Sequence, residues 1–228
     1  GLLYISALIP GYKDSDMWLL FSMQELVSEM EREVLDDGYS HEASTHYHRL
    51  VTELFLSASI LIERVSEERK KRLLIENIKN HKVKPRLKSI KKSKLFLNTS
   101  NSILPKHFFT KLKLMIEFTL YITKPNGLVP QIGDNDSARL HKLVPHFNQD
   151  YRDHKHILAV GELFFGSKSL LKKSVSSLIE AQIITGDLLQ DSHFDNNDFT
   201  GKSFYRNAGI GVLKNNTAFL LVSCGSNG

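Results

Sequence analysis

The sequence predicts a mainly α-helical protein that ends in a short β-segment. Over most of its 228 residues, apolar side chains recur three and four positions apart, which is the spacing of one helix face. Near Phe204 the spacing changes to every second residue, as in strands, and residues 214–217 are suited to a hairpin turn. Successive amphipathic helices with short polar connections pack as antiparallel pairs in a bundle, a toroid or a solenoid. The chain has no internal repeat of fixed period, which argues against a solenoid.

Five helices are predicted along the chain. Asp14, Ser15 or Asp16 can cap the first, and Pro105 is suited to open the third. The second helix is predicted to be buried, with Glu42 and Tyr47 at its head. Its expected apolar face consists of Tyr47, Leu50, Val51, Leu54, Ala58, Leu61, Ile62 and Val65. The predicted ranges are 14–35, 42–65, 105–123, 153–165 and 169–184.

The charge of the chain is unevenly distributed and points to a polyanionic partner. The net charge is +5, and basic residues crowd the stretch from Arg69 to Lys94, where Glu76 is the only acid. Such a stretch favours a uronate polysaccharide, a nucleic acid or lipid head groups, and a solvated insertion is the alternative reading. The stretch has no aromatic residue before Phe96, so the stacking platform of a single-stranded nucleic-acid site is missing and no nucleic acid is expected. No apolar run reaches the length of a membrane span, so no membrane partner is expected either.

The residue pattern suggests two domains, and the two ends of the chain suggest an incomplete protein. We predict a helical domain over residues 1–200, with a basic insertion at about 69–100, and the start of a β-domain over residues 201–228. Gly1 opens directly into an apolar stretch and Gly228 follows a strand-like run, so we expect an internal piece of a longer protein. Cys224 is the only cysteine, which excludes an internal disulfide, and we expect it to be a small buried residue.

Three segments of the chain carry short motifs. The first is Asp37-Gly38 followed by Glu42 and by Tyr47-His48. The second is the loop Pro130-Gln131-Ile132-Gly133-Asp134-Asn135-Asp136, which is followed by Arg139. The third consists of residues 209–213 and 222–228. Taken in this order, the segments resemble the heparinase II/III-like polysaccharide lyases, which are relatives of some alginate lyases. The resemblance implies an incomplete (α/α) toroid followed by the first strands of a β-sandwich domain.

The resemblance also implies a reaction, which is cleavage of an acidic, uronate-containing glycan by β-elimination. The reaction requires a group that neutralises the carboxylate, a base that takes the proton beside it, and an acid that protonates the leaving oxygen. In the family a Tyr of the Tyr-His pair supplies the acid or the base, and this Tyr corresponds to Tyr47. The family's carboxylate-neutralising Asn would precede Gly1, and its catalytic His, sometimes with a metal, would follow Gly228. We therefore expect no cofactor within this chain, an inactive piece on its own, and a bacterial periplasmic or secreted location.

Four further residues are candidates for substrate binding, each with a structural alternative. His48 would orient Tyr47 or contact sugar, or would only pack in the interior. For Glu42 we favour a helix cap over a contact with a sugar hydroxyl. Asp134 and Arg139 would lie near the sugar, or would belong to a structural turn.

No metal site is predicted. His46 and His48 lie two residues apart, as do His154 and His156, and residues at that spacing point to different faces of a helix. Asp134-Asn135-Asp136 resembles the start of a calcium loop, but the twelfth position holds Pro145 in place of Glu.

Two other functions remain open. A glycoside hydrolase would need two carboxyl groups beside the scissile bond, and Glu42 with Asp134 or Asp136 could supply them. A non-catalytic module that binds polyanions would depend mainly on the basic stretch.

Overall fold

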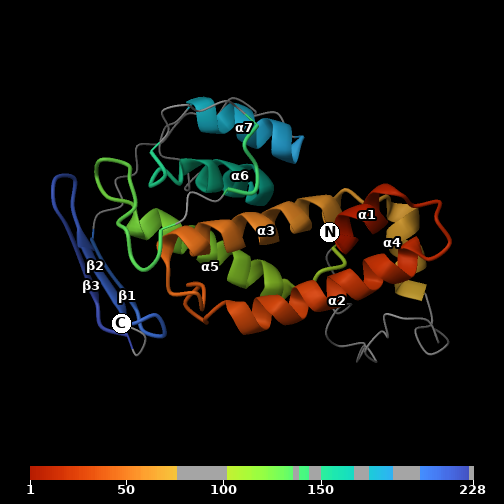
Figure 1. Cartoon of the computed structure of the whole chain (residues 1–228), viewed down its shortest axis with the longest axis horizontal. Helices are drawn as coiled ribbons and strands as arrows, with labels where there is room; N and C mark the ends of the chain where they lie inside the picture. Colours follow the sequence, from red (N-terminus) through yellow and green to blue (C-terminus); the bar gives the residue numbers. More distant parts are fainter. Residues whose placement is uncertain (76–101, 136–138, 144–149, 167–174, 187–200, 226–228) are drawn as a thin grey trace. The chain divides into compact units, whose positions relative to one another are not determined.

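The computed structural model describes residues 1–75, 102–135, 139–143, 150–166, 175–186 and 201–225. Most of the predicted basic insertion, residues 76–100, lies outside this part of the chain. The chain forms two compact units, the first made of residues 1–32 and 57–110 and the second of residues 33–56 and 111–228. The elements are α1 (Leu2–Leu8), α2 (Ser15–Glu33), α3 (Thr45–Glu63), α4 (Glu67–Ile75), α5 (Lys106–Ile122), α6 (Lys155–Phe165), α7 (Val175–Thr185), β1 (Gly201–Tyr205), β2 (Ile210–Lys214) and β3 (Phe219–Ser223), as Figure 1 shows.

The described part of the chain is mainly helical and carries one small antiparallel sheet, as predicted. The predicted helices at 14–35, 105–123 and 153–165 are confirmed as α2, α5 and α6, with ends that differ by at most two residues. The helix predicted at 169–184 is present as α7, and residues 169–174 lie outside the described part. The hairpin turn at residues 214–217 is also confirmed, because Asn215 Oδ1 accepts the N–H groups of Thr217 (2.9 Å) and Ala218 (2.7 Å) between β2 and β3.

Two helices were not predicted. One is α1, in the apolar stretch that follows Gly1, and the other is α4, within the basic stretch. For α4 a local signal was present in the sequence. Ser66 Oγ accepts the backbone N–H of Arg69 (3.3 Å), and Glu67 and Glu68 occupy the first turn, where acids stabilise a helix.

In the first unit, two cations of the basic stretch have structural roles. Arg69 is 3% exposed, and its guanidinium donates to Asp16 Oδ1 (2.6 Å) and to the carbonyl oxygens of Ser6 (2.8 Å) and Ala7 (3.0 Å) near the end of α1. Lys70 Nζ donates to the carbonyl of Glu63 (2.9 Å). These two cations stabilise helix ends and are not available to a polyanion.

The prediction of which face of α3 is buried was wrong for the first half of the helix. Leu54 is 45% exposed, and Tyr47, Leu50 and Val51 are half-buried. Thr45, His48, Arg49 and Thr52 are instead at most 1% exposed. Polar residues occupy the interior there because each finds a partner, as when Arg49 Nη1 donates to the Tyr151 carbonyl (2.6 Å) and Thr52 Oγ1 to the His48 carbonyl (2.6 Å).

In the second unit, the sheet has strand order β1-β2-β3, and one of its faces packs on a helical core. Ile210 and Val212 of β2 join an apolar cluster that also contains Tyr39, Phe118, Ile122 and Val129. In the antiparallel register Leu213 pairs with Leu220, and Gly211 lies between Phe204 and Val222. These residues form the opposite face, where Phe204, Leu213, Leu220 and Val222 are at least half exposed. Helices α6 and α7 pack against each other in the same unit (Figure 1).

Two further findings concern single features. Cys224 is exposed, so its predicted burial was wrong, because the residue directly follows the edge strand β3. No helix in the described ranges combines the length and the apolar character that a membrane span requires.

The turn between α2 and α3 holds the second unit together at Asp37 and Gly38. Asp37 Oδ2 accepts the N–H groups of Asn207 (2.7 Å) and Ala208 (2.9 Å) in the turn between β1 and β2. Gly38 has φ +89°, and a Cβ atom there would lie 2.5 Å from the carbonyl carbon of Leu114 in α5. The Asp-Gly pair therefore joins the turn to both the sheet and α5.

Replacing Gly38 tests this close packing. We expect Gly38→Ala to lower the free energy of unfolding by about 2–4 kcal/mol, because the methyl group adds overlap to an unfavourable positive φ. Gly166→Ala is the matched control, since Gly166 also has a positive φ (63°) but faces open space, and it should cost only about 1 kcal/mol. Denaturant unfolding checks both, and equal losses would show that the contact with α5 does not matter.

Candidate functional site

The first two motif segments meet at the start of α3. Thr45 donates its backbone N–H to the Ile132 carbonyl (3.1 Å) and its Oγ1 to the Pro130 carbonyl (3.0 Å). Ser44 Oγ donates to the Asp134 carbonyl (2.6 Å). The loop that contains Asp134 is therefore fixed by side chains only two and three residues before Tyr47, although about ninety residues separate the two segments in the sequence.

The helix start itself differs from the prediction. Helix α3 begins at Thr45, and Ser44 Oγ lies 3.2 Å from the N–H of His46 and 3.3 Å from that of Tyr47, which makes Ser44 the cap. Glu42 belongs to the turn before the helix, where its side chain is exposed. The helix starts late because Ala43 has a positive φ of 52°, which is not a helical conformation.

Tyr47 lies in the first turn of α3 on the more open side of the helix. Its side chain is half-buried, like those of Leu50 and Val51 on the same face. A phenol in this position is anchored by the helix and is still accessible to a ligand. Asp134 is exposed as well, so both candidates can contact solvent or a ligand.

His48 is engaged within the protein. It is fully buried, its Nδ1 accepts the backbone N–H of Ser40 (3.2 Å), and its Nε2 lies 3.0 Å from the Met115 carbonyl. This arrangement assigns the proton to Nε2, because Nδ1 must be unprotonated to accept. Burial lowers the pKa of His48 to about 4, so the ring is neutral at pH 7. Because both ring nitrogens are hydrogen-bonded to the backbone, His48 has no free atom for a sugar. It supports the fold around Tyr47.

Arg139 belongs to a buried ion cluster, which we define as Glu53, Arg139, His156 and Glu180. Arg139 Nη2 donates to Glu180 Oε2 (2.8 Å), and its Nε lies 3.6 Å from Glu53 Oε1. His156 Nε2 lies 2.6 Å from the same Glu53 oxygen. All four side chains are at most 6% exposed.

The ion cluster also fixes the chain that follows the Asp134 loop. Glu53 Oε2 accepts the N–H of Leu140 (2.6 Å), and Glu180 Oε1 accepts that of Leu143 (3.1 Å). Burial by itself would raise the pKa of Glu53, but the contacts with His156, the Leu140 N–H and Arg139 hold it below its usual value. Glu53 is thus an ionised anchor that connects α3 to residues 139–143.

Three buried histidines lie in the same unit, and one of them, His156, contacts Glu53. His46 and His154 are 1% and 2% exposed, and their rings meet edge to face with centroids 5.4 Å apart. Burial lowers the pKa of His46, His154 and His156, and the positive charge of Arg49 lowers all three further. The two His-x-His pairs predicted to be unsuited to metal do approach each other here. Even so, the described ranges contain no group of three or more His, Cys, Asp or Glu side chains placed to bind a metal ion.

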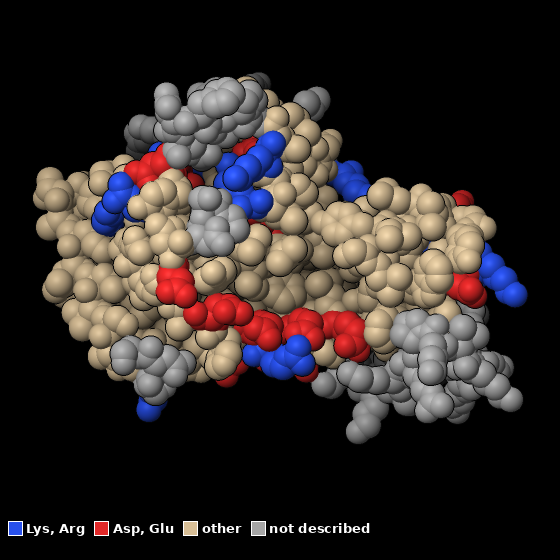
Figure 2. Space-filling view, in the orientation of Figure 1, with Lys and Arg blue, Asp and Glu red and all other residues tan. Residues whose placement is uncertain are grey.

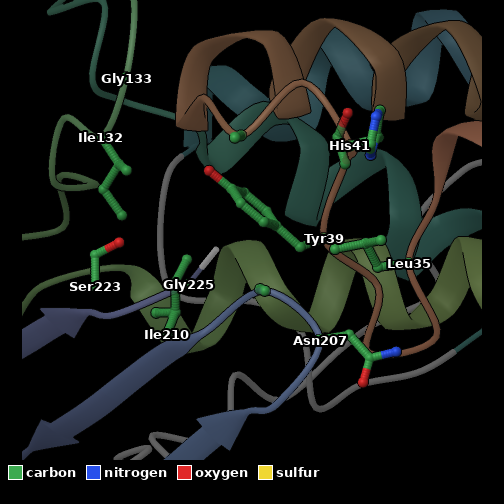
Figure 3. A pocket seen from close by; sticks show the side chains of 12 residues that line it. Leu35, Tyr39, His41, Ile132, Gly133, Asn207, Ile210, Ser223 and Gly225 are labelled. Carbon is green, nitrogen blue, oxygen red and sulfur yellow. The ribbon is translucent and has the colours of Figure 1, made fainter. Parts of the chain in front are cut away.

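A pocket of about 410 Å³ lies in the second unit, next to the turn before α3. Figure 3 shows Tyr39 and His41 from the α2–α3 connection, Ile132 and Gly133 from the Asp134 loop, and Ser223 from the end of β3 around it. The pocket is in the size range of ligand sites, which hold about 300–1,000 Å³.

Comparison with known proteins agrees with the motif resemblance. Residues 1–73, which include Asp37, Gly38, Glu42, Tyr47 and His48, match the model of the heparinase II/III N-terminus family. The N-terminal segment of the chain is thus similar to the heparinase II/III family. The crystal structure of heparinase III matches 97% of the chain at 21% identity, with a TM-score of 0.53, which is a likeness of fold. The chain spans 27% of the length of that solved relative, and no curated protein matches it.

Sequence reasoning missed several residues that build the site. Ser44 and Thr45 had a readable signal, since Ser or Thr just before a helical pattern is a common cap. Glu53 and Glu180 had none, because a charged residue on a helix is usually solvated and only its spatial partners show that it is buried.

Removing Arg139 tests the ion cluster. We expect Arg139→Met to lower the free energy of unfolding by about 3–5 kcal/mol, because it leaves the carboxylates of Glu53 and Glu180 buried without a cation. Arg152→Met is the control, since Arg152 is 38% exposed in its pair with Asp150 and should change stability little. Similar midpoints for the two variants in denaturant unfolding would contradict the structural role of the ion cluster.

Acidification should destabilise the second unit. The pKa values of His46, His48, His154 and His156 are lower in the folded protein than the value of about 6.5 in an unfolded chain. Unfolding therefore takes up protons, and the stability is fully present above about pH 6.5 and is lost as the pH falls below it. Glu53, whose folded pKa is also lowered, adds a loss in the same direction at lower pH.

We expect the free energy of unfolding to fall by up to about 1.4 kcal/mol per pH unit for each histidine that becomes protonated. Denaturant unfolding from pH 7.5 to 5 measures this slope. His154→Phe should reduce the number of protons taken up on unfolding by about one, and the slope should fall accordingly. A stability that stays constant or rises on acidification would contradict the burial of the four rings.

Proposed function

We propose that this chain is part of a polysaccharide lyase that cleaves a uronate-containing glycan by β-elimination, with Tyr47 as the acid or base. The observation that supports this most strongly is the placement of Tyr47. It lies half-buried in the first turn of α3, beside a loop that Ser44 and Thr45 hold in place, within a segment that matches the family.

In the proposed reaction a base removes the proton from the carbon beside the uronate carboxylate. The electron pair forms a carbon–carbon double bond, the bond from the neighbouring carbon to the glycosidic oxygen breaks, and that oxygen takes up a proton. The phenol of Tyr47 would donate the proton that the glycosidic oxygen takes up. Alternatively, the phenolate of Tyr47 would accept the proton that leaves the carbon. The group that neutralises the carboxylate is not among the candidates of this chain.

The other candidate residues then have distinct roles. We assign His48 and Arg139 to positioning, because His48 links α3 to α5 and Arg139 links the end of the loop to α3 and α7. Glu42 and Asp134 are exposed next to the helix start, and we propose that they contact sugar hydroxyls. We further propose that the helices form part of an (α/α) toroid and that the enzyme meets its polymer in the periplasm or outside the cell.

The charge on α2 argues against a glycan path along that helix. The second half of α2 carries Glu25, Glu29, Glu31 and Glu33, and Figure 2 shows a row of acidic side chains on this face of the molecule. A polyanion is repelled by such a row. We place the glycan at the start of α3 because the motif residues lie there.

Removal of the Tyr47 hydroxyl tests the proposal. In the full-length protein we expect Tyr47→Phe to lower kcat by about 10²–10⁴-fold, since general acid–base catalysis contributes that much, with little change in glycan binding. The assay follows the ultraviolet absorbance of the unsaturated sugar end on a panel of acidic polysaccharides. Tyr12→Phe, at a 53% exposed tyrosine of the first unit, is the control and should keep full activity.

The same assay separates the alternatives. New reducing ends without ultraviolet absorbance would indicate hydrolysis and would shift attention to Glu42 and Asp134. Near-normal elimination by Tyr47→Phe would contradict the role of Tyr47.

A further inference from the structure

The pocket next to the turn before α3 contains a buried hydroxyl group without a partner. Tyr39 is 3% exposed, and its Oη has no hydrogen-bond partner among the described residues. In Figure 3 the hydroxyl points from the ring towards the loop of Ile132, across the pocket. A buried hydroxyl without a partner is unfavourable, so this atom is suited to bind a polar group that enters the pocket.

The other polar groups that line the pocket are uncharged or weakly basic. They come from different parts of the chain, namely His41 before α3, Asn207 in the turn between β1 and β2, and Ser223 at the end of β3. Hydroxyl, amide and imidazole groups both donate and accept hydrogen bonds, as a ligand with several hydroxyl groups requires.

No Lys, Arg, Asp or Glu is found among the described residues that line the pocket. A carboxylate or a sulfate would lose its hydration there without gaining a cationic partner. The remaining wall is apolar and includes Leu35, Ile132 and Ile210, which suits the C–H face of a sugar ring.

The pocket adjoins the proposed catalytic helix. Ala43 and Gly133 line it, and the same two residues pack against each other where the loop meets the start of α3, since a Cβ atom on Gly133 would lie 2.8 Å from the Ala43 carbonyl oxygen. Ala43 precedes Tyr47 by four residues. A glycan bound at Tyr47 therefore has a neighbouring site within this unit.

We propose that this pocket binds an uncharged sugar unit of the glycan, through the Tyr39 hydroxyl and the polar groups around it. The inference rests on the proposed function and adds to it a substrate class. The polymer would contain a uronate, which reacts, and within a few sugar units of it a sugar that carries neither carboxylate nor sulfate.

Direct binding tests the pocket independently of turnover. Isothermal titration of the full-length protein would use two neutral probes, cellobiose and N,N′-diacetylchitobiose, and glucuronic acid as the charged counterpart. We expect at least one neutral probe to bind more tightly than glucuronic acid. Tyr39→Phe, which removes only the hydroxyl, should weaken that binding by about three- to tenfold.

Two matched pairs of variants keep the test specific. Tyr205→Phe changes a tyrosine that packs against the same apolar cluster without lining the pocket, and it should leave binding unchanged. Ser223→Leu should fill the pocket and abolish binding, whereas Val222→Leu, on the opposite face of β3, should not.

The proposal would be overturned by tighter binding of glucuronic acid, by no binding of either neutral probe, or by equal binding to Tyr39→Phe and the wild type. Failure of the proposed function gives a different pattern. Neutral probes would still bind and respond to Tyr39→Phe, while Tyr47→Phe would leave product formation unchanged.

Discussion

The hydrogen bonds from Ser44 and Thr45 to the Pro130–Asp134 loop are the constraint on which the candidate site depends. Two side-chain hydroxyls and one backbone N–H at the head of α3 satisfy carbonyl groups of the loop, so the loop and the helix start have one common geometry. This contact fixes the position of Tyr47. The pocket beside it is bounded by the same segments, and for that reason the proposed catalytic group and the proposed sugar site are parts of one arrangement.

A second layer of charged groups supports this arrangement from inside. Glu53 lies six residues after Tyr47 on α3 and binds Arg139, His156 and the N–H of Leu140. Taking such charges out of water is unfavourable unless every partner is present, so the ion cluster tolerates few alternative arrangements. Arg139 was a candidate for substrate binding in the sequence. In the structure it contributes mainly by fixing the chain on either side of it.

Parts of the site were predictable, and others were not. The meeting of the two motif segments followed from their resemblance to one family, and the cap at Ser44 could have been read from the sequence. The open position of Tyr47 was obscured by a helix pattern that assigns it to a buried face, and the polar interior of α3 depends on partners more than sixty residues away, such as Met115 and Tyr151. The unpartnered hydroxyl of Tyr39 has no signature in a sequence, since any buried tyrosine looks the same.

The sequence by itself determined the helices α2, α5 and α6, the hairpin after Lys214 and the similarity of the N-terminal segment to a family, because periodicity, caps, turns and motifs are local properties of the chain. The tertiary structure decided which face of α3 is buried, which cations are internal, and where a pocket remains. Those outcomes depend on hydrogen bonds and ion pairs between distant segments. A polar side chain can be buried only where such partners meet it, and no local pattern specifies that meeting.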